Sequence, residues 1–272
     1  MNTNSPSLVK TLQKLDHFFT ITSRATDFPF AECDPVTFDD QIRIFTFEKD
    51  AEKYLSELKE TGFPAGISRI ERSQMQSFYT GLFLAGINCI VFHDTESCSL
   101  PLDSIVTVKK PQQNKAMPPV INESLKLTCL YFLQELRRSG QSSQDAERIR
   151  KLRDLEQEIM ANLVRSDFIL ALDVTDMKGP VVPGKTNSNL KVPFLKNPAG
   201  NVLQPVFSDL WEFEEFRSRN KRKLQPAVVP FRRLAAALIP DACGCALNPS
   251  GFNLVLLKEK LEIMTKQADA EV

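Results

Sequence analysis

Residues 203–210 have the sequence LQPVFSDL, in which an apolar run ends at a Ser-Asp pair. The run from Leu203 to Phe207 has the length and composition of a buried strand. Asp209 stands where a helix N-cap belongs, and Glu212 follows three residues later, so we expect a helix over 209–219. A strand that leads into a capped helix is a building unit of mixed α/β domains.

The sequence on both sides of this unit continues the alternation of strands and helices. Upstream, FILALDV at 168–174 predicts a strand, a short strand follows at 191–195, and Asn197–Asn201 is a turn with Gly200 available for positive φ. Downstream we expect an extended run at 227–229, a helix at 231–238, a strand at 252–257 (FNLVLL) and a final helix at 258–267.

The first part of the chain repeats this order. Strands are predicted at 18–22, 42–47, 65–67 and 87–92, helices at 48–58 and 73–84, with 102–108 as the closing segment. Phe45 aligns with Phe207 at an offset of 162, which also places Phe63-Pro64 on Gln225-Pro226. The run 87–91 matches 252–256 at an offset of 165. Ordered similarity of this kind indicates an internal duplication.

A different pattern lies between the two repeats. Lys109 to Pro119 is polar, contains three prolines and predicts a linker. Helices are expected at 122–138 and 143–164, each with one apolar face. The fold class predicted is therefore α/β (α+β), with two related mixed-sheet domains at 1–110 and 166–272 joined by a linker and helical hairpin at 111–165.

Composition narrows the possible partners and location. The 34 basic and 34 acidic residues balance, which argues against nucleic acid as a partner. No stretch approaches the roughly 18 apolar residues of a membrane span, and residues 1–7 lack the features of a signal peptide. We therefore expect a cytoplasmic protein with six reduced cysteines and no membrane contact.

Three segments of the second half together resemble a known family: 194–200 (FLKNPAG), 205–210 (PVFSDL) and 246–256 (ALNPSGFNLVL). Their order is similar to the SseB N-terminal domain of bacterial proteins, over roughly residues 167–263. The first half keeps Phe45-Thr46 and Gly86-Ile87-Asn88, but it lacks Asn-Pro-x-Gly and has Phe47 in place of Asp209. The resemblance implies an α/β domain in a bacterial, cytoplasmic setting and supplies no catalytic residues.

One motif suggests nucleotide chemistry. Residues 179–186 fit the pattern G-x-x-x-x-G-K-[ST] through Gly179, Gly184, Lys185 and Thr186. A phosphate-binding loop requires a helix directly afterwards, whereas the next residues predict a turn and a strand. Two prolines within the motif also remove backbone donors. A hairpin loop is the favoured interpretation, and nucleotide binding is the alternative.

Three further features could indicate a metal site, a catalytic site or a charged binding surface, but each has a simpler structural interpretation. Cys243-Gly244-Cys245 lacks the spacing and the partner ligands of a zinc site, so burial is expected. His17 and His93 have no recognisable nucleophile nearby in the sequence and are assigned to surface loops. The basic run 217–223 follows an acidic helix start, as the helix dipole favours, and is assigned to the solvated end of that helix.

The sequence therefore favours a non-enzymatic protein that binds another protein or acts as a scaffold, without cofactor or metal and of undetermined oligomeric state. The alternative is a nucleotide- or small-molecule-dependent enzyme that uses Gly179 to Thr186. The expected partner surface is the set of family-like turns, with Pro205, Phe207, Asp209, Trp211, Asn248, Pro249 and Gly251.

Overall fold

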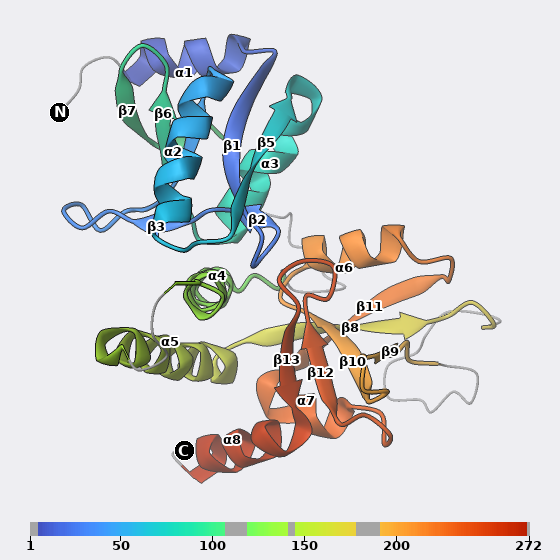
Figure 1. Ribbon diagram of the computed structural model, residues 1–272. Coiled ribbons are helices and arrows are strands. Elements are labelled where there is room, and N and C mark those ends of the chain that lie inside the picture. The colour runs from blue at the N-terminus through green and yellow to red at the C-terminus, as the bar shows by residue number, and fades with distance from the viewer. Residues whose placement is uncertain (1–4, 107–118, 141–144, 178–190, 271–272) are drawn as a thin grey trace. The chain divides into compact units, whose positions relative to one another are not determined.

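The computed structural model describes residues 5–106, 119–140, 145–177 and 191–270 (Figure 1). The chain forms two compact units: residues 1–112 with 126–157, and residues 113–125 with 158–272. Each unit contains one mixed β-sheet with helices packed against it. The fold class expected from the sequence, mixed α+β with two sheets, is confirmed.

The first unit has a sheet whose main strands lie in the order β5-β1-β4-β6-β7 (Figure 1). These strands are Ala65–Glu71, His17–Ser23, Asp40–Phe45, Cys89–His93 and Ser97–Pro101. Two short strands extend it, β2 (Phe28–Pro29) beside β1 and β3 (Glu32–Cys33) beside β4. The β4–β6 pair is parallel and all other pairs are antiparallel.

Helices cover both faces of this sheet. Helix α2 (Glu48–Glu60) places Ala51 and Leu58 in a cluster with alternate residues of β1 and β4. Helices α1 (Ser5–Lys14) and α3 (Arg72–Leu84) pack on the other face, where Phe18, Ile44 and Phe92 are buried. Successive strand residues point to opposite faces, so one β-strand supplies both cores.

Helices α4 (Glu123–Leu136) and α5 (Ala146–Val164) include the predicted helical hairpin. Within the first unit, the Gln134 amide pairs with the backbone of Ala31 at 3.1 and 2.8 Å. The buried Glu135 carboxylate accepts the Lys151 ammonium at 3.0 Å and also faces Arg138 and Arg148. The Gln134 contacts attach α4 to the segment between β2 and β3 of the first sheet, whereas the Glu135 ion pairs to Arg148 and Lys151 hold α4 and α5 to each other.

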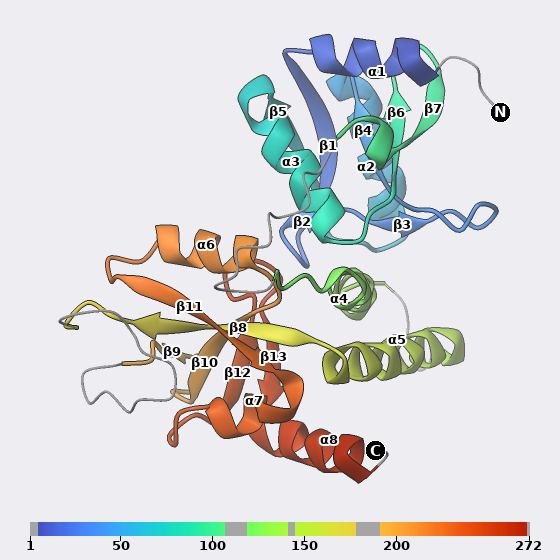
Figure 2. The same ribbon diagram turned by 180° about the vertical axis from the view of Figure 1, so that it is seen from behind.

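The second unit has the strand order β11-β8-β10-β12-β13, with β9 beside β10. These strands are Leu224–Pro230, Asp167–Asp173, Val202–Phe207, Gly244–Leu247, Leu254–Leu257 and, for β9, Leu195–Lys196. Helix α6 (Leu210–Ser218) lies on one face, and α7 (Phe231–Ala237) and α8 (Lys258–Ala270) lie on the other (Figures 1 and 2). The α6 face is closed by Phe207 and Phe213, whose rings meet edge to face.

The two sheets have the same connectivity. In the first sheet, β1 pairs antiparallel with β4 and with β5, and β4 pairs parallel with β6. In the second sheet, β8 pairs antiparallel with β10 and with β11, and β10 pairs parallel with β12. Phe19 opposes Phe45 in the first sheet as Ile169 opposes Phe207 in the second. Shared ancestry of the units stays a prediction, since connectivity alone does not prove it.

The parallel pairs correct the sequence alignment. Ile44 opposes Phe92 and Val206 opposes Leu247, so β6 corresponds to β12, and the match of 87–91 to 252–256 is wrong. The match of Pro64 to Pro226 is also wrong, because Pro226 pairs with Ala171 in the register that Ile67 has with Ile21. Helix α6 is shorter than α2, so the difference in residue number between corresponding positions of the two units becomes smaller after this helix.

Of the strands longer than two residues, β7 and β12 were not predicted from the sequence. Strand β7 is the hairpin partner of β6, and β12 is the hairpin partner of β13. Strand β12 begins at Gly244, where a Cβ would overlap the backbone of Leu256. Glycine is disfavoured in strands by propensity but is required where two backbones approach closely. Residues 102–104 form a short 3₁₀ turn.

Candidate functional site

The family-like turns of the second unit meet in a buried hydrogen-bond network at the start of α6. The Ser208 amide donates to Asn248 Oδ1 at 2.9 Å, and Asn248 Nδ2 donates to Ser208 Oγ at 2.8 Å. Ser208 Oγ in turn donates to Asp209 Oδ2 at 2.9 Å, and Asp209 Oδ1 accepts the Glu212 amide at 3.0 Å. Asp209 is thus the N-cap that the sequence predicted.

Asn122 and the backbone conformation of Asn248 also hold this corner in place. Asn122 Nδ2 donates to the carbonyls of Ser208 and Asp167, both at 2.7 Å. Asn248 has φ of +50°, a left-handed conformation that asparagine tolerates better than most residues. A fully satisfied buried network of this kind fixes one backbone geometry, so the first turn of α6 is a rigid platform.

The structure divides the expected partner surface into two groups. Pro205, Phe207, Asp209 and Asn248 are buried, so their side chains support the corner from inside. Trp211 is 42% exposed on the first turn of α6. Pro249 and Gly251 are half-buried in the turn after β12. A partner could touch these three residues, and the partner surface itself stays a prediction.

The other motifs have structural roles or lie outside the described residues. Gly179, Gly184, Lys185 and Thr186 lie outside the described residues. Cys245 is buried in β12, as expected, whereas Cys243 is exposed. Among the described residues, no group of three or more His, Cys, Asp or Glu side chains could hold a metal ion.

The basic run is partly tied to the second unit. Arg217 and Arg219 pair with Glu214 and Glu215 along α6. Arg222 donates to the buried Asp173 carboxylate at 2.6 Å. Burial opposes ionisation of Asp173, but hydrogen bonds from Thr175 and Arg222 outweigh it and lower its pKa to about 2. These pairs favour the helix-end interpretation of the run.

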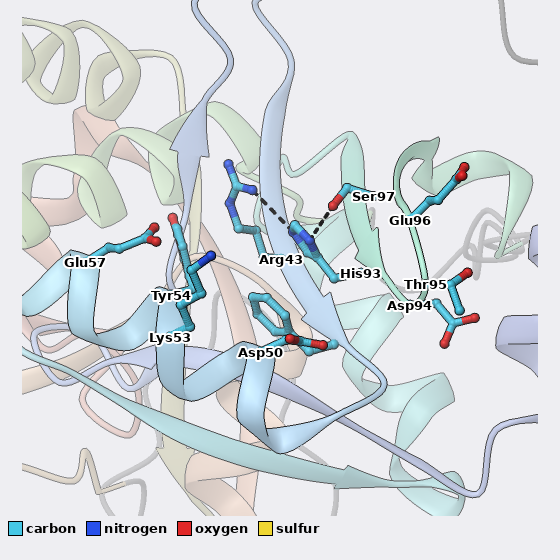
Figure 3. Close-up of a pocket in the computed structure, with 11 residues that line it drawn as sticks. Arg43, Asp50, Lys53, Tyr54, Glu57, His93, Asp94, Thr95, Glu96 and Ser97 are labelled. Carbon is cyan, nitrogen blue, oxygen red and sulfur yellow. Dashed lines mark hydrogen bonds between the residues drawn. The ribbon is translucent and has the colours of Figure 1, made fainter.

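A pocket of about 330 Å³ lies on the α2 face of the first sheet (Figure 3). Helix α2 packs on β5, β1 and β4. Pocket residues come from α2, from β4 and from β6 with its turn into β7, and include Arg43, Tyr54, His93 and Ser97. The charged groups at its mouth are Asp50, Lys53, Glu57, Asp94 and Glu96.

A chain of hydrogen bonds connects the inner wall of this pocket. Arg43 donates to Glu32 Oε1 at 2.7 Å from both Nε and Nη2, and from Nη1 to His93 Nε2 at 3.2 Å. Tyr54 donates to Glu32 Oε2 at 2.7 Å, and its ring lies 4.7 Å below the Arg43 guanidinium. The His93 ring stacks on Phe45, and its Nδ1 lies 2.7 Å from Ser97 Oγ (Figure 3).

The direction of these bonds sets the protonation of His93. A guanidinium only donates, so Nε2 must accept and the proton of the neutral ring resides on Nδ1. Nδ1 therefore donates to Ser97 Oγ. Burial, reinforced by the nearby Arg43 charge, lowers the pKa of His93, which agrees with a neutral ring.

This arrangement is opposite to that of a serine nucleophile. A general base must accept the hydroxyl proton of its serine, whereas His93 donates to Ser97 and its other nitrogen is occupied by Arg43. The Tyr54 hydroxyl is likewise committed to Glu32, and its pKa is raised by burial and by the Glu32 carboxylate. Arg43, Tyr54 and His93 are thus engaged with Glu32, with Ser97 and with one another.

The sequence did not reveal this pocket, and it misplaced His93. The residue is half-buried at the end of β6 and is not in a surface loop. Arg43 and His93 are fifty positions apart, and only the parallel β4–β6 pairing brings them together. The sequence does contain one sign of this site. Arg43 and His93 are polar residues in two apolar runs, IRIFTF and CIVFH, whose composition otherwise predicts buried strands.

Comparison with known proteins bears on the second unit. The model of the SseB protein N-terminal domain matches residues 147–262, which confirms the resemblance seen in the sequence. The matched stretch includes most of helix α5 and most of the second unit. The match does not include the first sheet.

Two solved structures share very low similarity with the chain. "Tic22 from Plasmodium falciparum" is 12% identical, with 97% of this chain and 98% of that chain covered and a TM-score of 0.21. "Anabaena Tic22 (protein transport)" is 9% identical, with 85% and 83% covered and a TM-score of 0.22. A search of curated proteins finds no match. No helix among the described residues has both the length and the apolarity to cross a membrane.

Proposed function

We propose that this chain is a non-catalytic bacterial cytoplasmic protein that binds another protein through the first turn of α6. The observation that carries the proposal is Trp211, which is 42% exposed beside Leu210, also 42% exposed. Large aromatic side chains at fixed, accessible positions supply most of the binding energy in many protein interfaces.

The buried corner behind Trp211 strengthens this proposal. Asp209, Ser208 and Asn248 fix the backbone that presents the tryptophan, so little conformational entropy is lost there on binding. The half-buried turn 249–251 lies against the same corner, since Gly251 sits close to the Glu212 carboxylate. The family-like residues thus act as the support of the surface and Trp211 as its contact.

The chemistry of the pocket in the first unit supports a non-catalytic role. Its histidine donates to the nearby serine, and its arginine and tyrosine are held by Glu32. A general base must be free to accept a proton from the substrate, and the histidine and tyrosine of this wall are already engaged. The pocket wall instead has the pattern of groups that stabilise one another.

The experiment uses the fact that Trp211 is the single tryptophan of the chain. Affinity-tagged intact protein, wild type and Trp211→Ser, is used to recover partners from its cells, with Ile263→Ser as the control because Ile263 is 57% exposed on α8. We expect a partner that is lost only with Trp211→Ser. In the purified complex, tryptophan emission should shift to shorter wavelength as the indole leaves water.

Equal recovery by wild type and Trp211→Ser would contradict the proposal. So would a purified complex whose tryptophan emission is the same as that of the free protein, because the indole would then stay in water.

A further inference from the structure

A loop at the edge of the first unit presents two large apolar side chains to solvent. Residues 34–39 connect β3 to β4 and project from the sheet (Figures 1 and 2). Val36 is 81% exposed and Phe38 is 75% exposed, the highest values among the large hydrophobic residues described. Single exposed apolar residues are common, but two at the tip of a projecting loop form a patch.

Hydrogen bonds hold this loop in one conformation. The Asp34 carboxylate accepts the amides of Val36 at 2.8 Å and Thr37 at 2.9 Å. The Asp34 carbonyl accepts the Phe38 amide, and the Asp34 amide donates to the Asp39 carbonyl, both at 2.9 Å. The two apolar side chains are therefore presented by an ordered turn.

The backbone of this turn is strained at Phe38, and burial of the Phe38 side chain does not compensate for the strain. Phe38 has φ of +60°, a left-handed conformation that is unfavourable for a bulky residue relative to glycine. Glycine or asparagine normally occupies this position of a hairpin loop. With its ring in water, Phe38 recovers little of that cost by burial. A strained and exposed aromatic residue therefore indicates a contact outside the chain.

Charge around the patch restricts what that contact can be. Residues 25–42 contain five acidic and no basic side chains. Glu32 is paired with Arg43, whereas Asp39 accepts from the Asn88 amide and Asp40 from the Tyr131 hydroxyl. Hydrogen bonds from the amides of Thr37 and Val36 lower the pKa of Asp34, so it is ionised. The apolar tip therefore stands on a negatively charged base.

We propose that the 34–39 loop is a second protein-binding surface, which inserts Phe38 and Val36 into an apolar pocket bordered by lysine and arginine on a partner protein. Complementary charge at the rim would steer the encounter. An anionic membrane is disfavoured, because the negative surface potential of its lipids repels acidic groups. This inference rests on observations of the first unit and does not depend on Trp211.

The first arm of the test identifies the contact. The photo-reactive residue p-benzoylphenylalanine replaces Val36 in the intact chain, cross-linking is done in cells, and the attached peptide is mapped by mass spectrometry. We expect one protein, attached at an apolar segment beside Lys or Arg. Attachment to a second copy of this chain, or no protein attachment, would overturn the inference.

The second arm separates recognition from folding. Phe38→Gly and Phe38→Asn remove the ring but suit the left-handed backbone, so the melting temperature should stay the same or rise. Binding to the purified cross-linked partner should weaken by about thirtyfold, as for loss of a hot-spot aromatic. Unchanged binding by both variants would refute the proposal, and Ile263→Ser is again the control.

The third arm tests the charge and the membrane alternative. Asp39→Asn keeps an oxygen for Asn88 but removes one charge, so partner binding should weaken at low salt and less at high salt. Wild type and Phe38→Gly are also mixed with vesicles of phosphatidylcholine, with and without phosphatidylserine. Salt-independent binding to the partner, or vesicle binding that Phe38→Gly abolishes, would each overturn the stated chemistry while leaving the Trp211 surface untouched.

Discussion

Helix α2 of the first unit lacks the cap that its counterpart α6 has, and Phe47→Asp should supply it. Phe47 occupies the N-cap position of α2 in an extended conformation, with no side-chain hydrogen bond to the helix. Asp209 occupies the same position of α6 and accepts the Glu212 amide. The neighbouring Thr46 hydroxyl is buried without a partner, whereas its counterpart Ser208 donates to Asp209.

The magnitude follows from these contacts. A capping aspartate is worth about 0.5–2 kcal/mol, and a hydrogen bond regained by Thr46 adds about 1 kcal/mol. Glu48 and Asp50 in the first turn oppose a third negative charge, which removes a few tenths. Loss of the Phe47 ring costs little because it is 55% exposed. We expect about 1–2 kcal/mol of added stability in the first unit.

The chain offers its own reporters for each unit. Its three tyrosines, Tyr54, Tyr79 and Tyr131, all lie in the first unit, and its single tryptophan lies in the second. Urea unfolding followed by tyrosine near-ultraviolet circular dichroism should shift to higher midpoint in Phe47→Asp, with the Trp211 fluorescence transition unchanged. The control Phe47→Ala removes the ring without adding a cap.

A Phe47→Asp variant no more stable than Phe47→Ala would show that aspartate at this position does not cap α2.

Three more changes test the buried polar groups of the two units. Asp209→Ala should lower the stability of the second unit by about 2–3 kcal/mol, because it uncaps α6 and leaves a buried network incomplete; a Trp211 transition that does not move would contradict this. Glu135→Ala should lower the free energy of unfolding of the first unit by about 3 kcal/mol, because Arg148 and Lys151 lose the buried carboxylate with which they pair. An unchanged tyrosine transition would contradict this. The lowered pKa of His93 means that the folded state resists protonation while the unfolded state accepts it, so stability of the first unit should be full above about pH 6.5 and fall below it. His93→Gln should remove that part of the pH dependence, and an identical profile in the variant would show that another group titrates.

Local signals were sufficient to predict most elements. Apolar runs such as 168–174 and the Asp209 cap predicted strands and a helix within a few residues of their observed ends. The three family-like segments lie within the residues that match the SseB N-terminal domain model, 147–262. These features depend on near neighbours in the chain, and hydrophobic period and capping chemistry report such neighbours directly.

Contacts between distant segments were not predictable in this way. Strand β12 starts with a glycine that propensity disfavours, and its need arises from the backbone of β13. Arg43 meets His93 only because β4 and β6 pair in parallel. Which family-like residues are buried and which, like Trp211, face water depends on how α6 packs on the sheet. Local chemistry thus determined the elements and the domain family, whereas long-range pairing and burial, which no local pattern contains, decided the pocket and the exposed surfaces.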